Sequence, residues 1–347
     1  MGLLQILHFA PRVKVNRHSA QQAADPLMQA LNAADYKRCF NMLHSVTSAD
    51  YAAMLWGVSS QPQALALVQA WVLAEPGSLD GAVFLGTCLM EECLRLRASL
   101  SANASEAKPG DEAAKEQVNK KSMELAVQAQ NLFEGVIEAD RAKSEAYAGL
   151  IRLGYMLNRN MDRLHACFIN GVKHDMLNFA CFYQFFLATL ERYGGSHKLM
   201  FDFLRWAEEY APAGDYIHVL TACAYNELAL SEFKNANGQW GMFRKKMRNA
   251  DYRRDVAKAL YGWLNATDRN LAPSLFEKEG ILKQYALNQF AVALYLTGAR
   301  EETKAVILEL GEVIQPAPWS WFAISKRETR DPGFVYDRFN SEIQRKF

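Results

Sequence analysis

Residues 62–86 read PQALALVQAWVLAEPGSLDGAVFLG, and they carry the strongest structural signal in the chain. Ala64, Trp71 and Pro76 are spaced by 7 and 5 residues, and Leu85 and Gly86 follow Pro76 by nine and ten. This spacing is typical of the end of one 34-residue helix–turn–helix repeat and the start of the next. Small residues let paired helices approach closely, large apolar residues fill the space between them, and a proline ends the second helix. The stretch therefore predicts stacked helix pairs.

The pattern is helical in almost every segment from about residue 25 onward. Proline and glycine residues stand at the breaks between the helical segments, among them Pro62, Pro109-Gly110, Gly194-Gly195, Pro273, Gly298 and Pro316. Around residues 143–176 the spacing drifts from the tetratricopeptide consensus by one or more positions. The sequence thus predicts an all-α protein, an irregular α-solenoid of tetratricopeptide-like helix pairs with a short N-terminal arm.

Composition divides the chain into three parts. An N-terminal arm and helices are expected over 1–97, a mobile linker with a helix start over 98–122, and the main helical-repeat array over 123–347. The three parts are also compatible with one continuous domain. The linker is rich in Ala, Ser, Lys and Glu and has almost no large apolar residue before Val118. Its second half is expected to begin a helix that continues through Ile137.

The N-terminal arm allows two interpretations. Leu4, Ile6 and Phe9 suit either a short strand or an apolar arm that docks on the body of the protein. We see no convincing alternating strand pattern after residue 15.

Composition excludes several functional classes. The chain has 347 residues, 50% of them hydrophobic, and a net charge of +1, so it has no overall bias toward nucleic acid or an anionic membrane. It lacks a run of about 18 apolar residues and a secretory signal pattern, so we expect a cytoplasmic protein without a membrane span. The six cysteines form no CxxC pair and are expected to be buried, reduced thiols; they are residues 39, 88, 93, 167, 181 and 223.

Several helix boundaries follow from local pattern. An unusually aromatic helix is expected over 179–190, with Gly194 as its C-terminal cap and Ser196 as the N-cap of the next helix, which runs to about Tyr210. Near the end, one helix is expected to stop at Gly298 and the next to run on to Pro316.

The residues that could form a catalytic or metal site are better explained by structural roles. Ser196 and His197 are sequence neighbours whose side chains diverge on a helix, and a GxSxG elbow is missing. His165, Cys167 and His174 fit none of the common zinc spacings. The carboxylate pairs favour solvated helix faces, and they are Glu91-Glu92, Glu208-Glu209 and Glu301-Glu302. A glycine-rich phosphate loop is also missing. We therefore expect no catalytic residue, no metal and no cofactor.

One basic cluster leaves three alternatives open. Residues 243–254 read FRKKMRNADYRR, with Trp240 close by. The cluster suits a solvated helix–turn–helix surface, a nucleic-acid-binding face or a site for an acidic protein. The balanced total charge favours the solvated surface and argues against nucleic acid.

An acidic stretch follows the aromatic helix and includes Glu232, with Arg205 as the only basic residue inside it. An acidic surface could block the basic groove of a nuclease, although an ordinary solvated face explains the same residues. The residues that we expect to bind a partner are Asp202, Glu208, Glu209, Asp215, Glu227, Tyr193 and Trp206.

The stretch from about 62 to 233 resembles a bacterial domain-of-unknown-function family with tetratricopeptide-like helices. The most similar block is ERYGGSH at 191–197, followed by Met200, Phe203, Ala207 and then Ala211-Pro212. Some family members look like immunity proteins for type VI secretion effectors. The resemblance implies a toxin-neutralising role and carries over no catalytic residue.

The sequence therefore leads to one main functional hypothesis. The chain is expected to be a cytoplasmic immunity protein that neutralises a cognate antibacterial toxin, of nuclease type, by occluding its active site. The alternative is a helical-repeat scaffold or chaperone-adaptor that binds a secretion or regulatory component in a groove. An enzyme would need a set of convergent polar residues that the sequence pattern does not reveal.

Overall fold

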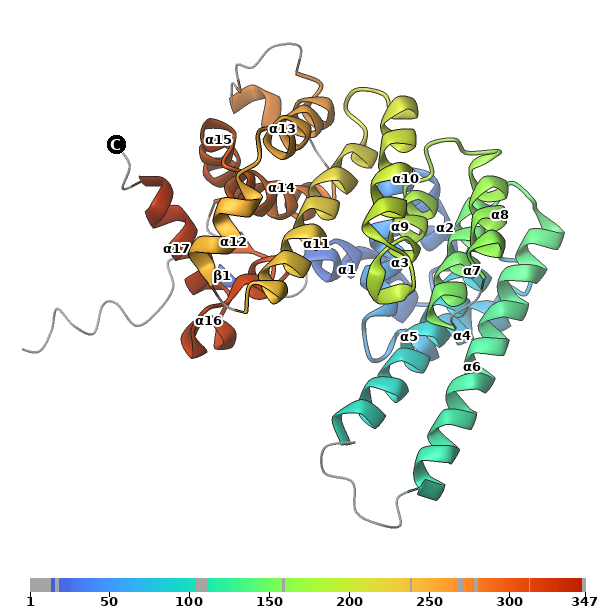
Figure 1. The fold of residues 1–347 in the computed structure, drawn as a ribbon. Helices are drawn as coiled ribbons and strands as arrows, with labels where there is room; N and C mark the ends of the chain where they lie inside the picture. The colour runs from blue at the N-terminus through green and yellow to red at the C-terminus, as the bar shows by residue number, and fades with distance from the viewer. Residues whose placement is uncertain are drawn as a thin grey trace, which may run out of the picture. The chain divides into compact units, whose positions relative to one another are not determined.

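The structure is a computed structural model that describes residues 14–15, 19–103, 112–157, 160–237, 239–266, 271, 273–277, 280–311 and 313–344. Its elements are almost all helices, so the predicted all-α fold class is confirmed (Figure 1). Contacts between residues separate the chain into two compact units. One is Ala20–Ser196, called here the 20–196 unit, and the other joins Met1–Ser19 to His197–Phe347 and is called the 197–347 unit. The division of the sequence into 1–97, 98–122 and 123–347 stays a prediction.

The 20–196 unit is built from consecutive helices that pack on one another. The pairs α5–α6, α7–α8 and α7–α9 are in contact, and so are α6–α7 and α3–α9. Its elements are α1 (Ser19–Asn32), α2 (Tyr36–His44), α3 (Ser48–Ser59), α4 (Ala64–Ala74), α5 (Leu79–Asn103), α6 (Glu112–Ala139), α7 (Ser144–Met156), α8 (Met161–Val172), α9 (Phe179–Ala188) and the 3-10 helix η2 (Glu191–Tyr193).

The repeat-like stretch folds as its spacing indicates. Ala64 and Trp71 are fully buried on α4, and this helix ends at Ala74, just before Pro76. The indole N–H of Trp71 donates to Glu75 at 3.1 Å, so the polar group of this buried side chain has a partner. The predicted helix after the linker is confirmed as α6, whereas linker residues 104–111 lie outside the described residues.

Two glycines explain how α5, α6 and α7 come together. Phe133 of α6 is fully buried. A Cβ atom at Gly86 of α5 would lie 2.7 Å from its ring, and one at Gly149 of α7 would lie 2.5 Å from it. Side chains cannot approach that closely, so the ring packs directly on the backbone of both helices. The small residue at Gly86 therefore has the packing role that its place in the repeat pattern predicts.

The 197–347 unit has its own core, and α11 and α13 both pack against α14. Its largest fully buried side chains are Trp263, Trp319, Phe243, Phe290 and Phe322. Its elements are β1 (Lys14–Val15), α10 (His197–Tyr210), η3 (Tyr216–His218), α11 (Val219–Asn235), α12 (Trp240–Met247), α13 (Ala250–Leu264), η4 (Pro273–Phe276), α14 (Lys283–Thr297), α15 (Arg300–Leu310), β2 (Val313–Ile314), η5 (Trp319–Phe322), α16 (Lys326–Arg330) and α17 (Gly333–Gln344).

Two expected helix ends are corrected by the structure. The helix predicted to reach Pro316 stops at Leu310, because Gly311 takes a positive φ of 68° and turns the chain away. The next residues form β2, which pairs in parallel with β1, so the end of the N-terminal arm is a short strand. A two-residue strand is too short to show an alternating pattern, which explains why sequence analysis missed β2. The arm residues Leu4, Ile6 and Phe9 lie outside the described residues.

The second correction concerns Gly194. The aromatic helix α9 ends at Ala188, and Gly194, with φ of 89°, caps the short helix η2 instead. Gly195 has no room for a side chain, because a Cβ there would lie 1.9 Å from the carbonyl oxygen of Thr189. The two glycines therefore permit a tight turn of the backbone that a residue with a side chain would not allow.

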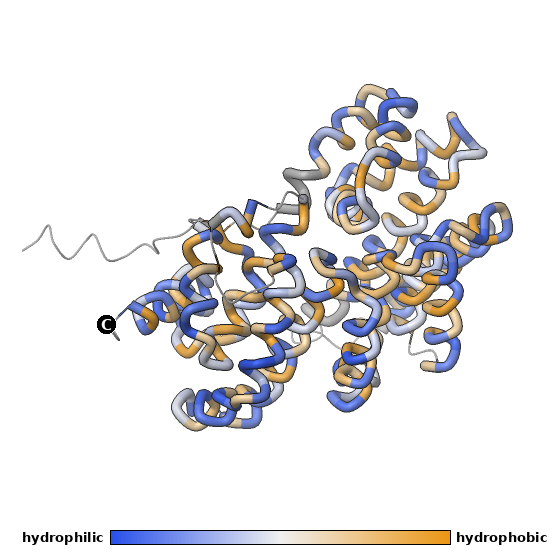
Figure 2. Tube along the Cα trace, turned by 90° about the horizontal axis from the view of Figure 1, so that it is seen from above, coloured by the Kyte–Doolittle hydropathy of each residue, from blue (hydrophilic) through white to orange (hydrophobic). Residues whose placement is uncertain are grey.

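Hydrophobic and hydrophilic positions are interspersed along the helices, as amphipathic packing requires (Figure 2). Among the helices of the described residues, none has the combination of length and apolar character that crossing a bilayer demands.

Candidate functional site

A pocket of about 360 Å³ lies on the 20–196 unit, where α3, α5, α7, α9 and η2 meet. We call it the aromatic pocket. The residues that line it are Trp56, Glu91, Leu94, Arg152, Tyr155, Met156, Tyr183, Gln184, Leu187 and Tyr193. Each helix contributes side chains from the face that it turns toward its neighbours, so the pocket exists only when the helices are packed.

The walls of the aromatic pocket are pairs of rings. Trp56 of α3 and Tyr183 of α9 have ring centroids 4.9 Å apart. Tyr155 of α7 and Tyr193 of η2 form a second pair at 4.6 Å. Such tilted contacts hold the rings in fixed orientations. Trp56, Tyr183 and Tyr193 are each only partly buried, so part of every ring remains open to a ligand.

One ion pair lies within the aromatic pocket. Arg152 of α7 donates to Glu91 of α5 at 2.5 Å, and only 14% of the Arg152 side chain is exposed. Burial has the largest single effect and lowers the pKa of Arg152, but the charge and hydrogen bond of Glu91 and the nearby tyrosine hydroxyls together leave the pKa raised. The hydroxyl of Tyr155 donates to Gln184 at 2.9 Å, and burial raises the Tyr155 pKa. The pocket therefore combines apolar rings with polar groups that already have partners.

Of the residues that we expected to bind a partner, Tyr193 lies in this pocket. Tyr193 belongs to the sequence block at 191–197, and the turn at Gly194 and Gly195 directly follows η2. Sequence analysis missed Trp56 and Arg152 as pocket residues. The aromatic helix expected over 179–190 does contain Tyr183. This tyrosine is half-buried beside the core phenylalanines of the same helix.

The expected acidic residues lie on the 197–347 unit, and most of them have partners. Asp202 pairs with Lys198 at 2.6 Å and with Arg205, and these contacts lower its pKa, the hydrogen bond from Lys198 most of all. Glu208 accepts a hydrogen bond from Thr221 at 2.6 Å and lies 3.5 Å from Lys258. The face is therefore less negative than its sequence suggests.

The remaining members of the predicted set have local roles or exposed positions. Asp215 caps η3 by accepting from the N–H of Ile217 at 2.8 Å. Trp206 packs against Tyr210 with ring centroids 5.0 Å apart. Glu209 is exposed, and Glu227 is half-buried on α11.

The other candidate groups also have structural partners. Glu92 pairs with Arg95, Glu301 with Lys304, and Glu302 accepts from the hydroxyl of Tyr261. Five of the six cysteines are buried and Cys167 is partly exposed, and all six are free thiols. Within the part of the chain that the structure describes, no cluster of three His, Cys, Asp or Glu side chains has the arrangement of a metal site.

Comparison with protein-family models, curated proteins and solved structures finds no match for this chain. The resemblance of residues 62–233 to a bacterial family therefore stays a prediction from the sequence.

Proposed function

We propose that this chain binds another protein, with the aromatic pocket as the anchor site. The observation that carries this proposal is the set of half-buried rings of Trp56, Tyr183 and Tyr193 around a cavity of about 360 Å³. Aromatic side chains in preformed pockets contribute most to binding energy at protein interfaces. Because Arg152 and Glu91 neutralise one another, the pocket suits an apolar anchor side chain of the partner.

The specific form of the proposal is a cytoplasmic immunity protein that neutralises a cognate antibacterial toxin. The block at 191–212 supports it through the family resemblance, and Tyr193 links that block to the aromatic pocket. Neutralisation would occlude the active site of a nuclease-type toxin and needs no chemistry from this chain.

Co-expression tests the immunity proposal. Cells that produce the product of the adjacent toxin gene together with this chain are expected to grow, and the two proteins are expected to co-purify. Full toxicity in cells that produce both proteins contradicts the proposal.

The role of the aromatic pocket is tested by Tyr193→Ala. We expect this variant to bind the toxin about 30-fold more weakly, because a central aromatic anchor contributes about 2 kcal/mol. Tyr210→Ala is the matched control, since Tyr210 is 51% exposed and lies on the other unit. Isothermal titration calorimetry measures both affinities, and thermal unfolding checks that both variants are folded. Unchanged affinity of Tyr193→Ala, or an equal loss for Tyr210→Ala, excludes the pocket as the anchor site.

A scaffold or chaperone-adaptor remains the second candidate, because a neutral aromatic pocket also suits apolar anchors of several different peptides. It predicts several partners with dissociation constants on the order of micromolar, whereas an immunity protein predicts one much tighter complex. The number of co-purifying partners and their affinities distinguish the two.

A further inference from the structure

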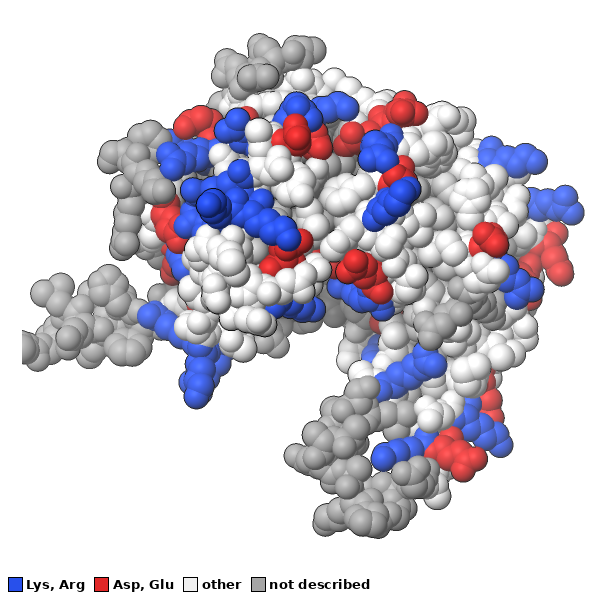
Figure 3. All heavy atoms as spheres, viewed as in Figure 1, with Lys and Arg blue, Asp and Glu red and all other residues white. Residues whose placement is uncertain are grey.

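Arginines from three separate helical segments of the 197–347 unit surround one glycine turn. Arg244 and Arg248 come from α12 and its C-terminal cap, Arg253 from the start of α13, and Arg300 from the first residue of α15. They line two adjoining cavities, of about 20 and 210 Å³, that share Arg248, Gly298 and Arg300. We call this region the arginine pocket. Figure 3 shows the corresponding concentration of Lys and Arg over α12.

The turn at Gly298 allows the three segments to meet. Gly298 has a φ of 86° and ends α14, with its N–H donating to Leu294 at 3.0 Å. The side chain of Arg248 lies directly over this turn, since a Cβ at Gly298 would be 3.6 Å from the Cγ of Arg248. The chain then enters α15, which places Arg300 beside the same cavity.

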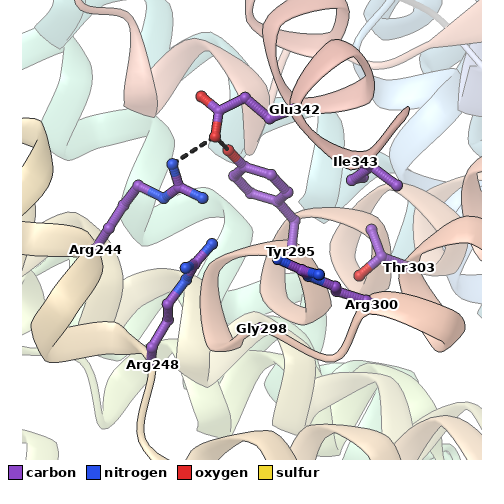
Figure 4. A pocket seen from close by; sticks show the side chains of 8 residues that line it. All are labelled: Arg244, Arg248, Tyr295, Gly298, Arg300, Thr303, Glu342 and Ile343. Carbon is purple, nitrogen blue, oxygen red and sulfur yellow. Dashed lines mark hydrogen bonds and ion pairs between the residues drawn. The ribbon is translucent and has the colours of Figure 1, made fainter. Parts of the chain in front are cut away.

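The smaller cavity contains one carboxylate, and that carboxylate is already engaged. Glu342 of α17 accepts a hydrogen bond from Arg244 and another, at 2.7 Å, from the hydroxyl of Tyr295. In Figure 4 the dashed lines join Glu342 to Arg244 and Tyr295, whereas Arg248 and Arg300 lie nearer the backbone end of Tyr295. Three arginines thus line a cavity with a single carboxylate.

The larger cavity is more strongly positive. Its lining includes Arg248, Arg253 and Arg300 and contains no acidic side chain; the other lining residues are Asn249, Ala250, Thr297 and Gly298. Partial burial, together with the charges of Arg244 and Arg300, lowers the pKa of Arg248, as expected for a cation among cations. This concentration of like charge costs free energy unless an anion enters.

The acidic residues closest in sequence to the arginine pocket have other partners. Asp251 pairs with Arg254 at 2.9 Å, and Glu301 lies 3.5 Å from Lys304. Glu302 accepts from Tyr261 at 2.8 Å. These contacts join the three carboxylates to groups that do not line the arginine pocket.

Two helix N-termini add positive potential to the larger cavity. α13 begins at Ala250 and α15 at Arg300, both within the lining. The side chain of Asn249 caps α13 by accepting from Asp251, whereas the N-cap residue of α15 is Ala299, which offers no side-chain acceptor. Free N–H groups in a first helical turn are good donors to an anion.

We infer that the arginine pocket binds the phosphoryl groups of a small anion such as pyrophosphate. A phosphoryl group offers oxygens in several directions, and guanidinium groups from Arg248, Arg253 and Arg300 approach the cavity from three segments. A carboxylate has two oxygens in one plane and satisfies fewer of these donors. The site is independent of the aromatic pocket, which lies on the other unit.

Calorimetric titration of the full chain with pyrophosphate tests the inference. We expect saturable binding that weakens as salt concentration rises, because the contacts are electrostatic. Arg253→Gln and Arg300→Gln are each expected to weaken binding about tenfold, because each removes a charge-assisted hydrogen bond to the anion. Both side chains are exposed, so folding should survive, and thermal unfolding confirms it. Arg205→Gln is the control, because Arg205 lies on α10 in a pair with Asp202.

Further ligands identify the source of the phosphoryl group. Stronger binding of ADP than of pyrophosphate assigns the site to a nucleotide, and equal binding assigns it to the free anion; both results support the inference. The inference is overturned by a lack of pyrophosphate binding at millimolar concentration, by equal binding of succinate, or by equal weakening by Arg205→Gln. Binding of a DNA oligonucleotide that depends on Lys245 and Lys246 but not on Arg253 or Arg300 also overturns it, and indicates a nucleic-acid face instead.

Discussion

Phe133→Ala is expected to lower the free energy of unfolding by about 3–5 kcal/mol, the usual loss for a fully buried phenylalanine. The ring packs on the backbone at Gly86 and Gly149, where neither residue has a side chain that can fill the vacated space. The cavity therefore stays open, and three helices lose a shared contact. Urea unfolding followed by circular dichroism measures the change.

Leu73→Ala is the control for this prediction, because Leu73 is 81% exposed on α4 and should change stability by less than about 0.5 kcal/mol. Gly149→Ala is a second variant with a distinct outcome. Its new methyl group collides with the Phe133 ring in the parent protein but occupies empty space in Phe133→Ala. The double variant should therefore lose less stability than the sum of the single variants. A loss below about 1 kcal/mol for Phe133→Ala contradicts the proposed packing.

Asp80→Ala is expected to cost about 3 kcal/mol, because it removes the closest carboxylate partner of the mostly buried Lys143 and leaves that cation with the more distant Glu145, at 3.7 Å. Asp80 is 4% exposed on α5. Its carboxylate accepts from the hydroxyl of Tyr51 on α3 at 2.7 Å and from Lys143, which precedes α7, at 2.5 Å. It also lies 3.8 Å from His44 of α2, so one carboxylate joins four segments of the 20–196 unit.

A second variant separates charge from packing. Asp80→Asn removes the charge but keeps the size of the side chain, and it should lose less stability than Asp80→Ala. The control is Glu92→Ala on the same helix, whose partly exposed pair with Arg95 should contribute about 0–1 kcal/mol. Equal losses for Asp80→Ala and Glu92→Ala rule out a special role for the buried pair.

The repeat-like stretch shows what local pattern can establish. Trp71 and Pro76 predict a buried ring and a helix end, and both are found, because helix periodicity and proline geometry act within a few residues. The prediction failed at Gly311 and in the short strand that follows it. The strand is completed by residues 14–15, so its formation depends on the backbone of a distant segment.

The candidate sites show a similar limit. Tyr193 was found from a local motif, but its pocket also needs Trp56, which is far away in sequence. The basic residues at 243–254 were visible as a cluster, whereas Arg300 was not part of it. Glu208 of the acidic stretch lies 3.5 Å from Lys258, and the local sequence does not reveal this partner because it comes from another helix.

The sequence by itself therefore determined the helical class, the helix ends near Pro76, Tyr210 and Gly298 and the burial of Trp71, since these depend on contacts between near neighbours along the chain. Tertiary structure alone decided which helix faces meet. That choice placed Trp56 beside Tyr183 and Arg300 beside Arg248, because side-chain volume and charge compensation across distant segments select the packing.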